Sequence, residues 1–194
     1  YGYGYGSEGE FFRFGFLKGY DRGQFDRTTN ERAQRVLAHA NAQIDRGLAL
    51  FKQGDYYAAA DAFQLATETD HGDAASRIYA GHTLFAIGRY RDGVRFLRRA
   101  FQLQPRITYL NYDIRDDYAD PADFDRQLEA LREALALAPS DPDRLFMLGY
   151  VLYYTGQRGE AYSTLAQVVR ANPKDEIASR LMRNAQPPDI HRSE

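Results

Sequence analysis

The chain has 194 residues, which suits one domain or one short repeat array and is long enough to bury a core without disulfide staples. Its formal net charge is -2 and it contains no cysteine, so neither nucleic acid nor an anionic membrane is favoured as partner, and a disulfide framework or thiolate metal site is excluded. The longest strongly apolar run, 145–154, is about half of what a bilayer span requires, so we expect no membrane insertion.

Residues 1–28 differ in composition from the rest of the chain. Tyrosine alternates with glycine at the start, and a Phe-rich segment follows a Ser-Glu-Gly-Glu turn. Alternation is typical of an extended chain, in which Phe12, Phe14 and Phe16 lie on one side, so we predict an extended arm and not a helix. The residues expected to make the arm's contacts are Tyr1, Tyr3, Tyr5, Phe11, Phe12, Phe14, Phe16 and Leu17.

A disordered low-complexity tail is the alternative for this segment. Disordered segments are poor in aromatic residues, whereas this one is rich in them, so we expect an ordered arm. The sequence starts at Tyr1 and not at Met, which indicates either a removed signal peptide or a fragment. Of these we favour the signal peptide, and therefore an extracellular or periplasmic location.

After the arm, punctuating residues recur at intervals of 34 residues. One glycine series has steps of 34 and 68 residues and comprises Gly47, Gly81 and Gly149. A second series follows seven residues later and comprises Gly54, Gly88 and Gly156. An apolar series with the same spacing comprises Phe63, Leu97, Leu131 and Leu165. Prolines close the units at Pro105, Pro139 and Pro173.

These residues predict stacked helix hairpins. The first glycine series allows two helices to cross closely, and the second suits the left-handed turn that ends a helix. We expect a first helix from Thr29 to Gln53 and a capping helix over 175–184, with Ile177 and Leu181 facing inward. Residues 107–121 lack both glycines, but we expect a helix there too, and a helix cap at Asp120 or Pro121. The solenoid then covers 29–184 and a loose tail covers 185–194.

The 34-residue period with this punctuation resembles the tetratricopeptide repeat family over about residues 40–173. The chain also looks similar to short bacterial members with a Tyr/Gly-rich N-terminal leader. The resemblance implies an all-α fold: a right-handed α-solenoid of about four helix-turn-helix units with a C-terminal capping helix. The predicted arm precedes it.

In this family the first helix of each unit lines a concave groove, which implies a set of groove residues here. They are Ile44, Leu48, Phe51, Ile78, His82, Phe85, Tyr109, Tyr112, Phe146, Tyr150, Tyr153 and Tyr154. Such an aromatic groove suits a partner with apolar or aromatic side chains. The alternative is that these rings are core between helices. The family's clamp for C-terminal carboxylates is disfavoured, because Ile44, Leu48, Tyr79 and Asp113 stand where basic and amide residues are needed.

Other constellations point to no chemistry. The four histidines are scattered, and no nucleophile elbow, phosphate-binding loop or zincin motif is present, so we expect no enzyme, no cofactor and no metal. The acidic cluster between Asp113 and Asp125 lacks calcium-loop spacing and fits a solvated face, with calcium as the alternative. A stripe of arginines at Arg91, Arg95, Arg98 and Arg99 is expected on the convex surface.

Two functions follow from these patterns. The first is a protein–protein interaction scaffold that self-assembles into a homo-oligomer or polymer when its arm docks on a neighbouring subunit, as a structural or filament-forming protein. The second is a monomeric adaptor whose groove binds a peptide of another protein. The arm would be intermolecular in the first case and self-docked or loose in the second.

Overall fold

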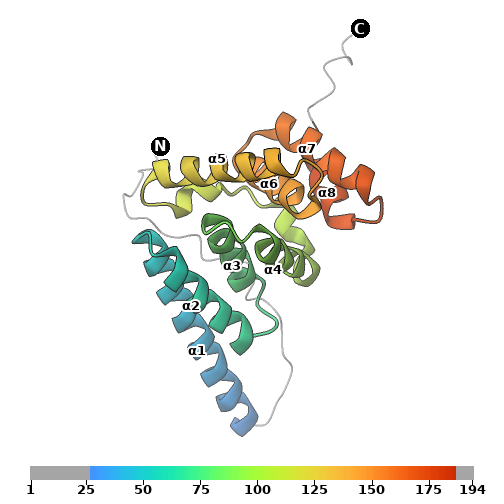
Figure 1. Cartoon of the computed structure of the whole chain (residues 1–194). Coiled ribbons are helices and arrows are strands. Elements are labelled where there is room, and N and C mark those ends of the chain that lie inside the picture. Colours follow the sequence, from blue (N-terminus) through green and yellow to red (C-terminus); the bar gives the residue numbers. More distant parts are fainter. Residues whose placement is uncertain (1–26, 187–194) are drawn as a thin grey trace, which may run out of the picture.

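The computed structural model describes residues 27–186, and over these residues every regular element is helical. Residues 1–26 of the predicted arm and 187–194 of the predicted tail lie outside this range. The helices pack into a short α-solenoid, as predicted (Figure 1). They are α1 (Arg27–Lys52), α2 (Tyr56–Thr69), α3 (Ala74–Ala86), α4 (Tyr90–Leu103), the 3-10 turns η2 (Pro105–Tyr109) and η3 (Ile114–Asp117), α5 (Pro121–Leu137), α6 (Pro142–Tyr154), α7 (Arg158–Ala171) and α8 (Glu176–Ala185).

Three complete hairpins, α1–α2, α3–α4 and α6–α7, are held by the first glycine series. A Cβ at Gly47 would lie 2.7 Å from the ring of Phe63, one at Gly81 would lie 2.5 Å from Leu97, and one at Gly149 would lie 2.6 Å from Leu165. In each hairpin, the glycine of the first helix therefore leaves the space into which the large apolar side chain of the second helix packs. This confirms the predicted close crossing in all three hairpins.

The turns inside these hairpins use the second glycine series. Gly54, Gly88 and Gly156 have φ values of 79°, 75° and 77°, which only glycine adopts without strain. Aspartates start many of the helices, because a carboxylate accepts hydrogen bonds from the free N–H groups of a first turn. The aspartates that cap a helix in this way are Asp55, Asp73, Asp120, Asp141 and Asp175.

The helix predicted in the segment 107–121 is absent, and this expectation was wrong. Two 3-10 turns stand in its place, joined by extended residues, and we call residues 104–120 the crossing segment. Pro105 starts the first turn, and the Asp113 side chain accepts from the N–H of Arg115 to start the second. Such local side-chain bonds compete with a continuous helix. The predicted cap of the following helix is confirmed, with Asp120 as N-cap and Pro121 in the first turn.

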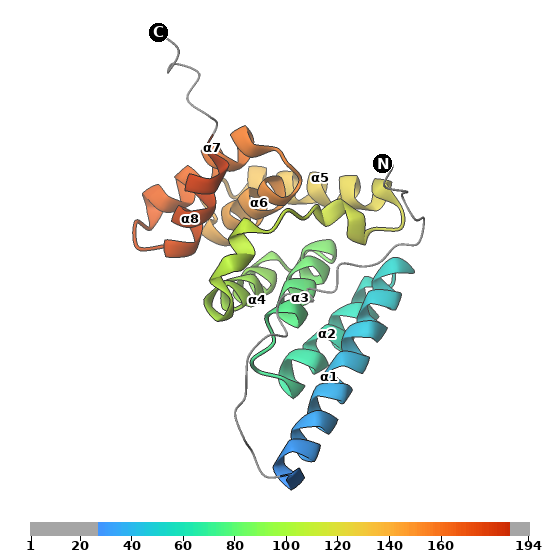
Figure 2. The same cartoon turned by 180° about the vertical axis from the view of Figure 1, so that it is seen from behind.

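Because the helix predicted before α5 is absent, the fourth repeat unit (α6–α7) packs directly on the second unit (α3–α4). Helix α6 contacts α4, and a Cβ at Gly93 of α4 would lie 2.7 Å from Met147 of α6. The crossing segment runs from the end of α4 past α3 to the start of α5, which then leads back to α6 (Figure 2). The stack is therefore shorter than four full hairpins.

The two ends of the described solenoid differ. Helix α1 has 26 residues and α2 only 14, so the N-terminal half of α1 projects beyond its partner (Figure 1). At the other end, α8 closes the stack on α7 with Ala178 and Leu181 buried. Leu181 faces inward as predicted, while Ile177 is only half-buried. The predicted capping helix is thus confirmed within one residue.

Candidate interaction surfaces

Most of the residues predicted to line the groove, on what would be the inner face of the solenoid, are buried. Nine are buried: Leu48, Phe51, Ile78, His82, Phe85, Phe146, Tyr150, Tyr153 and Tyr154. Ile44 and Tyr112 are half-buried, and Tyr109 is 70% exposed. Within the described structure these rings thus correspond to the alternative interpretation, in which they are core.

The crossing segment accounts for much of this burial. The hydroxyls of Tyr153 and Tyr154 donate to the carbonyls of Thr108 and Ile107, both at 2.7 Å. At the other end of the segment, Lys52 Nζ donates to the carbonyl of Asp116 at 3.0 Å. The segment is therefore tied to α6 and to the end of α1, and it crosses the face on which a foreign peptide would have to lie.

A buried polar cluster joins this segment to α3 and α6. His82 Nδ1 lies 3.1 Å from Asp117 Oδ2, and His82 Nε2 lies 2.8 Å from the Tyr150 hydroxyl. A neutral imidazole satisfies both contacts by donating to the carboxylate and accepting from the tyrosine. Tyr112 donates a second hydrogen bond to Asp117, and its ring stacks on that of His82.

Ionisation of the tyrosines in this cluster is strongly disfavoured. Burial raises the pKa of Tyr112 well above its ordinary value, and the neighbouring Asp117 charge raises it further. Burial likewise raises the pKa of Tyr150, with smaller contributions from Tyr154 and Asp117. Both phenols are thus neutral donors near neutral pH, as the cluster requires.

The inner face leaves no room for a small ligand beside this cluster. The space among Leu48, Phe51, Phe63, Tyr79, His82 and Asp117 holds no void that would accept a water molecule. The cluster resembles catalytic constellations in residue type, but its polar groups are directed at one another, so we read it as structural.

Some members of the acidic cluster and of the arginine stripe form pairs within the protein. Asp113 pairs with Arg115 at 2.5 Å, Asp123 pairs with Arg126, and Asp117 belongs to the buried cluster. Among residues 27–186, no group of three or more His, Asp or Glu side chains is arranged to hold a metal ion. Arg98 is half-buried and binds Asp175 with two hydrogen bonds of 2.9 and 2.6 Å, so this arginine is not a solvated one.

A charged surface hollow of about 460 Å³ lies between the first turns of α4 and α6. It is lined by three arginines and three aspartates, which pair as Arg89–Asp92 (2.6 Å), Arg144–Asp141 (3.6 Å) and Arg91–Asp143 (3.8 Å). The charges balance, so the hollow favours neither an anion nor a cation. No helix within the described residues is long and apolar enough to cross a membrane.

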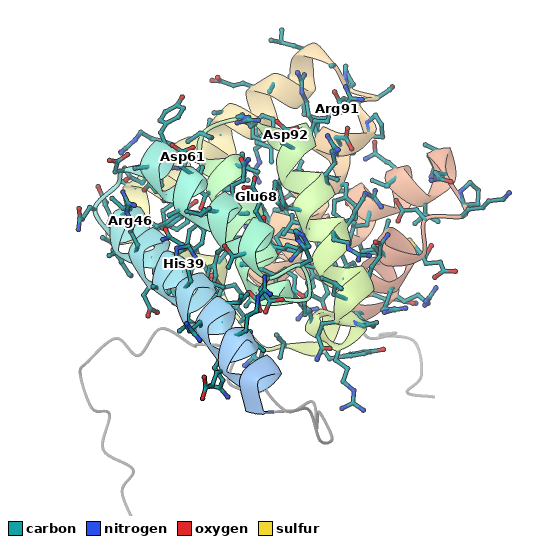
Figure 3. The ribbon with its side chains drawn as sticks, turned by 90° about the horizontal axis from the view of Figure 1, so that it is seen from below. His39, Arg46, Asp61, Glu68, Arg91 and Asp92 are labelled. Carbon is teal, nitrogen blue, oxygen red and sulfur yellow. The ribbon has the colours of Figure 1, made fainter. Side chains whose placement is uncertain are left out.

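The outward side of the α1–α2 hairpin is a second exposed surface on which charged and polar side chains are regularly spaced (Figure 3). His39 and Arg46 lie along α1, while Asp61 and Glu68 lie along α2, and all four are exposed. Sequence reasoning missed this surface, although its signal was present as charges seven residues apart on both predicted helices.

Comparison with known proteins supports the repeat assignment. Residues 121–185 match the family model for the tetratricopeptide repeat, a range that contains α5 to α8. No curated protein matches the sequence significantly.

Several solved structures match the chain at low identity. The first TPR of Spaghetti (RPAP3), bound to an HSP90 peptide, is 14% identical, with 76% of this chain and 90% of that chain covered and a TM-score of 0.38. MamA from Desulfovibrio magneticus RS-1 is 15% identical (76% and 89% covered, TM-score 0.35). YrrB, described as having an unusual peptide-binding site, is 18% identical (82% and 82% covered, TM-score 0.34). At scores this low the likeness supports no statement about partners.

Proposed function

The chain belongs to the tetratricopeptide repeat family, and from this premise we propose that it is a protein–protein interaction scaffold that assembles with copies of itself. Each repeat buries its apolar faces against the next, so such a protein offers extended surfaces and no catalytic machinery.

The observation that carries the proposal is the occupied inner face. A peptide-binding adaptor needs accessible side chains along this face, yet Tyr153 and Tyr154 donate to carbonyls of the crossing segment. His82 is 2% exposed and both of its ring nitrogens have partners inside the protein. Displacing the crossing segment would break the hydrogen bonds of the Tyr153 and Tyr154 hydroxyls and of Nδ1 of His82, which costs about 1–3 kcal/mol for each. The monomeric adaptor is therefore the weaker candidate.

The N-terminal arm is the segment that we propose links one subunit to the next. It is rich in aromatic side chains, and an extended chain of 28 residues reaches on the order of 90 Å at about 3.3 Å per residue. Docking on a different surface of a neighbour is a heterologous contact, which closes into a ring or continues as a filament. This would make the protein a structural or filament-forming subunit.

Removal of residues 1–26 tests this role, because the deletion ends where α1 begins. Light scattering and negative-stain microscopy should show large species for the full chain and small ones for the shortened chain. A chain lacking residues 187–194 is the matched control and should assemble like the full chain. If all three were monomers, self-assembly would be wrong and the adaptor would become the better proposal; if all three were equally large, the arm would not be the link.

A finer variant separates the arm's aromatic rings from its length. Replacing Phe12, Phe14 and Phe16 together by serine keeps the chain length and removes one apolar side of the arm. We expect this variant to assemble as poorly as the deletion. Assembly equal to that of the full chain would show that these rings are not the contact.

A further inference from the structure

The outer face of the α1–α2 hairpin consists of exposed side chains that alternate between apolar and charged or polar. We define it by Val36, His39 and Arg46 on α1 and by Asp61, Leu65 and Glu68 on α2. Val36 and Leu65 are both 41% exposed, which is high for aliphatic side chains. The spacing of three and four residues keeps each set on one side of its helix.

The two helices carry opposite charge. Helix α2 contains Asp61 and Glu68 and no basic residue, whereas α1 has an excess of arginine. Arg46, His39 and Asp61 make no hydrogen bond or ion pair within the described structure, and Glu68 only accepts from Gln64 of its own helix. Thus Arg46 and His39 on α1 lie beside Asp61 and Glu68 on α2, on one surface and with their polar groups available (Figure 3).

The charged and polar side chains of the two helices also lie at matching heights along the hairpin. His39 precedes Arg46 by seven residues, and Asp61 precedes Glu68 by the same number on a helix that runs back along α1. Seven residues span about 10 Å on a helix. Since the helices are antiparallel, Arg46 lies near the level of Asp61, and His39 lies near that of Glu68 (Figure 3).

We infer that the outer face binds the outer face of a second copy across a twofold axis parallel to the helices. Such an axis places α1 of one copy over α2 of the other, so Arg46 meets Asp61 and His39 meets Glu68, each pair occurring twice. Leu65 comes to lie within the contact. The N-terminal half of α1 projects beyond α2 in both copies, which brings the two Val36 side chains into the same interface.

A second copy fits better than an unrelated partner because the surface is complementary to itself. Opposite charges on the two helices would repel a uniformly acidic or basic protein from one half of the face. This contact does not involve the arm, so it adds a second kind of link to the assembly proposed above. Arm contacts and face contacts together would join dimers into longer assemblies.

Charge reversal tests the contact in the full chain. The chain has no cysteine, so Leu137→Cys provides one labelling site per chain, at a position on α5 that is 88% exposed. Association is then followed by energy transfer between chains that carry a donor dye and chains that carry an acceptor dye. R46E and D61R should each raise the dissociation constant by about tenfold to a hundredfold, since the axis repeats each altered pair. R95E on α4 and D125R on α5 are matched controls at exposed positions and should leave it unchanged.

Mixing the two variants gives the decisive result. In a pair of one R46E chain and one D61R chain, both contacts again join opposite charges, so we expect association restored to nearly that of the unaltered chain. A sample that contains only one of the two variants still carries the arm but has repelling charges at the face. Its association therefore measures binding through the arm alone. Equal association for the mixture and for the separate variants would overturn the proposed face, whatever the arm deletion shows.

Discussion

Asp117 Oδ2 lies 3.1 Å from Nδ1 of His82, inside the protein, and this contact joins the crossing segment to helix α3. The same carboxylate accepts a hydrogen bond from Tyr112, and the other ring nitrogen of His82 is bound to Tyr150. Four side chains from three parts of the chain therefore satisfy one another in a region that excludes water.

Replacement of Asp117 by alanine should destabilise the protein strongly. It removes the carboxylate that binds Nδ1 of His82 and the Tyr112 hydroxyl, and the loss of each of these two hydrogen bonds costs about 1–3 kcal/mol. We expect the free energy of unfolding, measured by urea denaturation, to fall by about 2–4 kcal/mol. Asp116→Ala at the exposed neighbouring position is the control and should change it by less than about 0.5 kcal/mol. Equal effects of the two substitutions would contradict the role assigned to Asp117.

The close crossing of α3 and α4 gives a second prediction. A Cβ at Gly81 would lie 2.5 Å from Leu97, which is fully buried and cannot move aside freely. Gly81→Ala should therefore lower the free energy of unfolding by about 1–3 kcal/mol through overpacking. Gly159→Ala in α7 is the control, because nothing lies within 4 Å of the added carbon. Alanine there should raise stability by about 0.4–1 kcal/mol by reducing the freedom of the unfolded chain, and loss of stability at both sites would contradict the packing argument.

The repeat fold was predictable because its signals are local. Glycines with a required positive φ, glycines that receive a large side chain, and the Asp120–Pro121 helix start all follow from residue type and spacing. The family match over residues 121–185 supports the same assignment.

The inner face was less predictable because its exposure depends on a segment that breaks the repeat. Pro105 and the missing glycines indicated that this part of the chain departs from the repeat pattern. They did not indicate that residues 104–120 would cross the inner face and bury Tyr153 and Tyr154. The pairing of Asp117 with His82, 35 residues apart, has no sequence signal of its own. The outer face, in contrast, is visible in the sequence once α1 and α2 are known to be antiparallel.

The buried tyrosines predict a loss of stability in alkali. Burial raises the pKa of Tyr112, Tyr118, Tyr150 and Tyr154 well above the ordinary value of 10.0. The native state therefore keeps these protons after the unfolded state has begun to lose them, so stability is full below about pH 10 and falls as pH rises further. Denaturation at pH 8, 10 and 11 should show this decline.

One substitution tests whether these tyrosines cause the decline. Tyr150→Phe removes one buried phenol, so the slope of stability against pH above about 10 should become shallower by about 1.4 kcal/mol per pH unit. Tyr57→Phe is the control, because Tyr57 is 72% exposed and the slope should not change. An unchanged slope in Tyr150→Phe would mean that other groups govern the alkaline transition.

Arg98 and Asp175 form an ion pair that ties α4 to the capping helix α8. Arg98 binds Asp175 through two hydrogen bonds of 2.9 and 2.6 Å, and its guanidinium lies 4.1 Å from the centre of the Phe146 ring. Burial alone would raise the pKa of Asp175, but the bonds from Arg98 and from the N–H of Ala178 outweigh it, and the pKa lies below the ordinary 3.8.

Arg98→Met should lower the free energy of unfolding by about 2–4 kcal/mol at pH 7, because it leaves a buried carboxylate that has lost its charged partner. Since the pKa of Asp175 is lowered in the native state, its contribution is present above the unfolded value of about 3.9 and is lost as pH falls through the native one. The difference between the unaltered chain and the variant should therefore shrink below about pH 4. Arg95→Met, on the exposed side of the same helix, should have little effect at either pH. A difference that stayed constant down to pH 2 would show that Arg98 acts through its packing on Phe146 and not through the charge of Asp175.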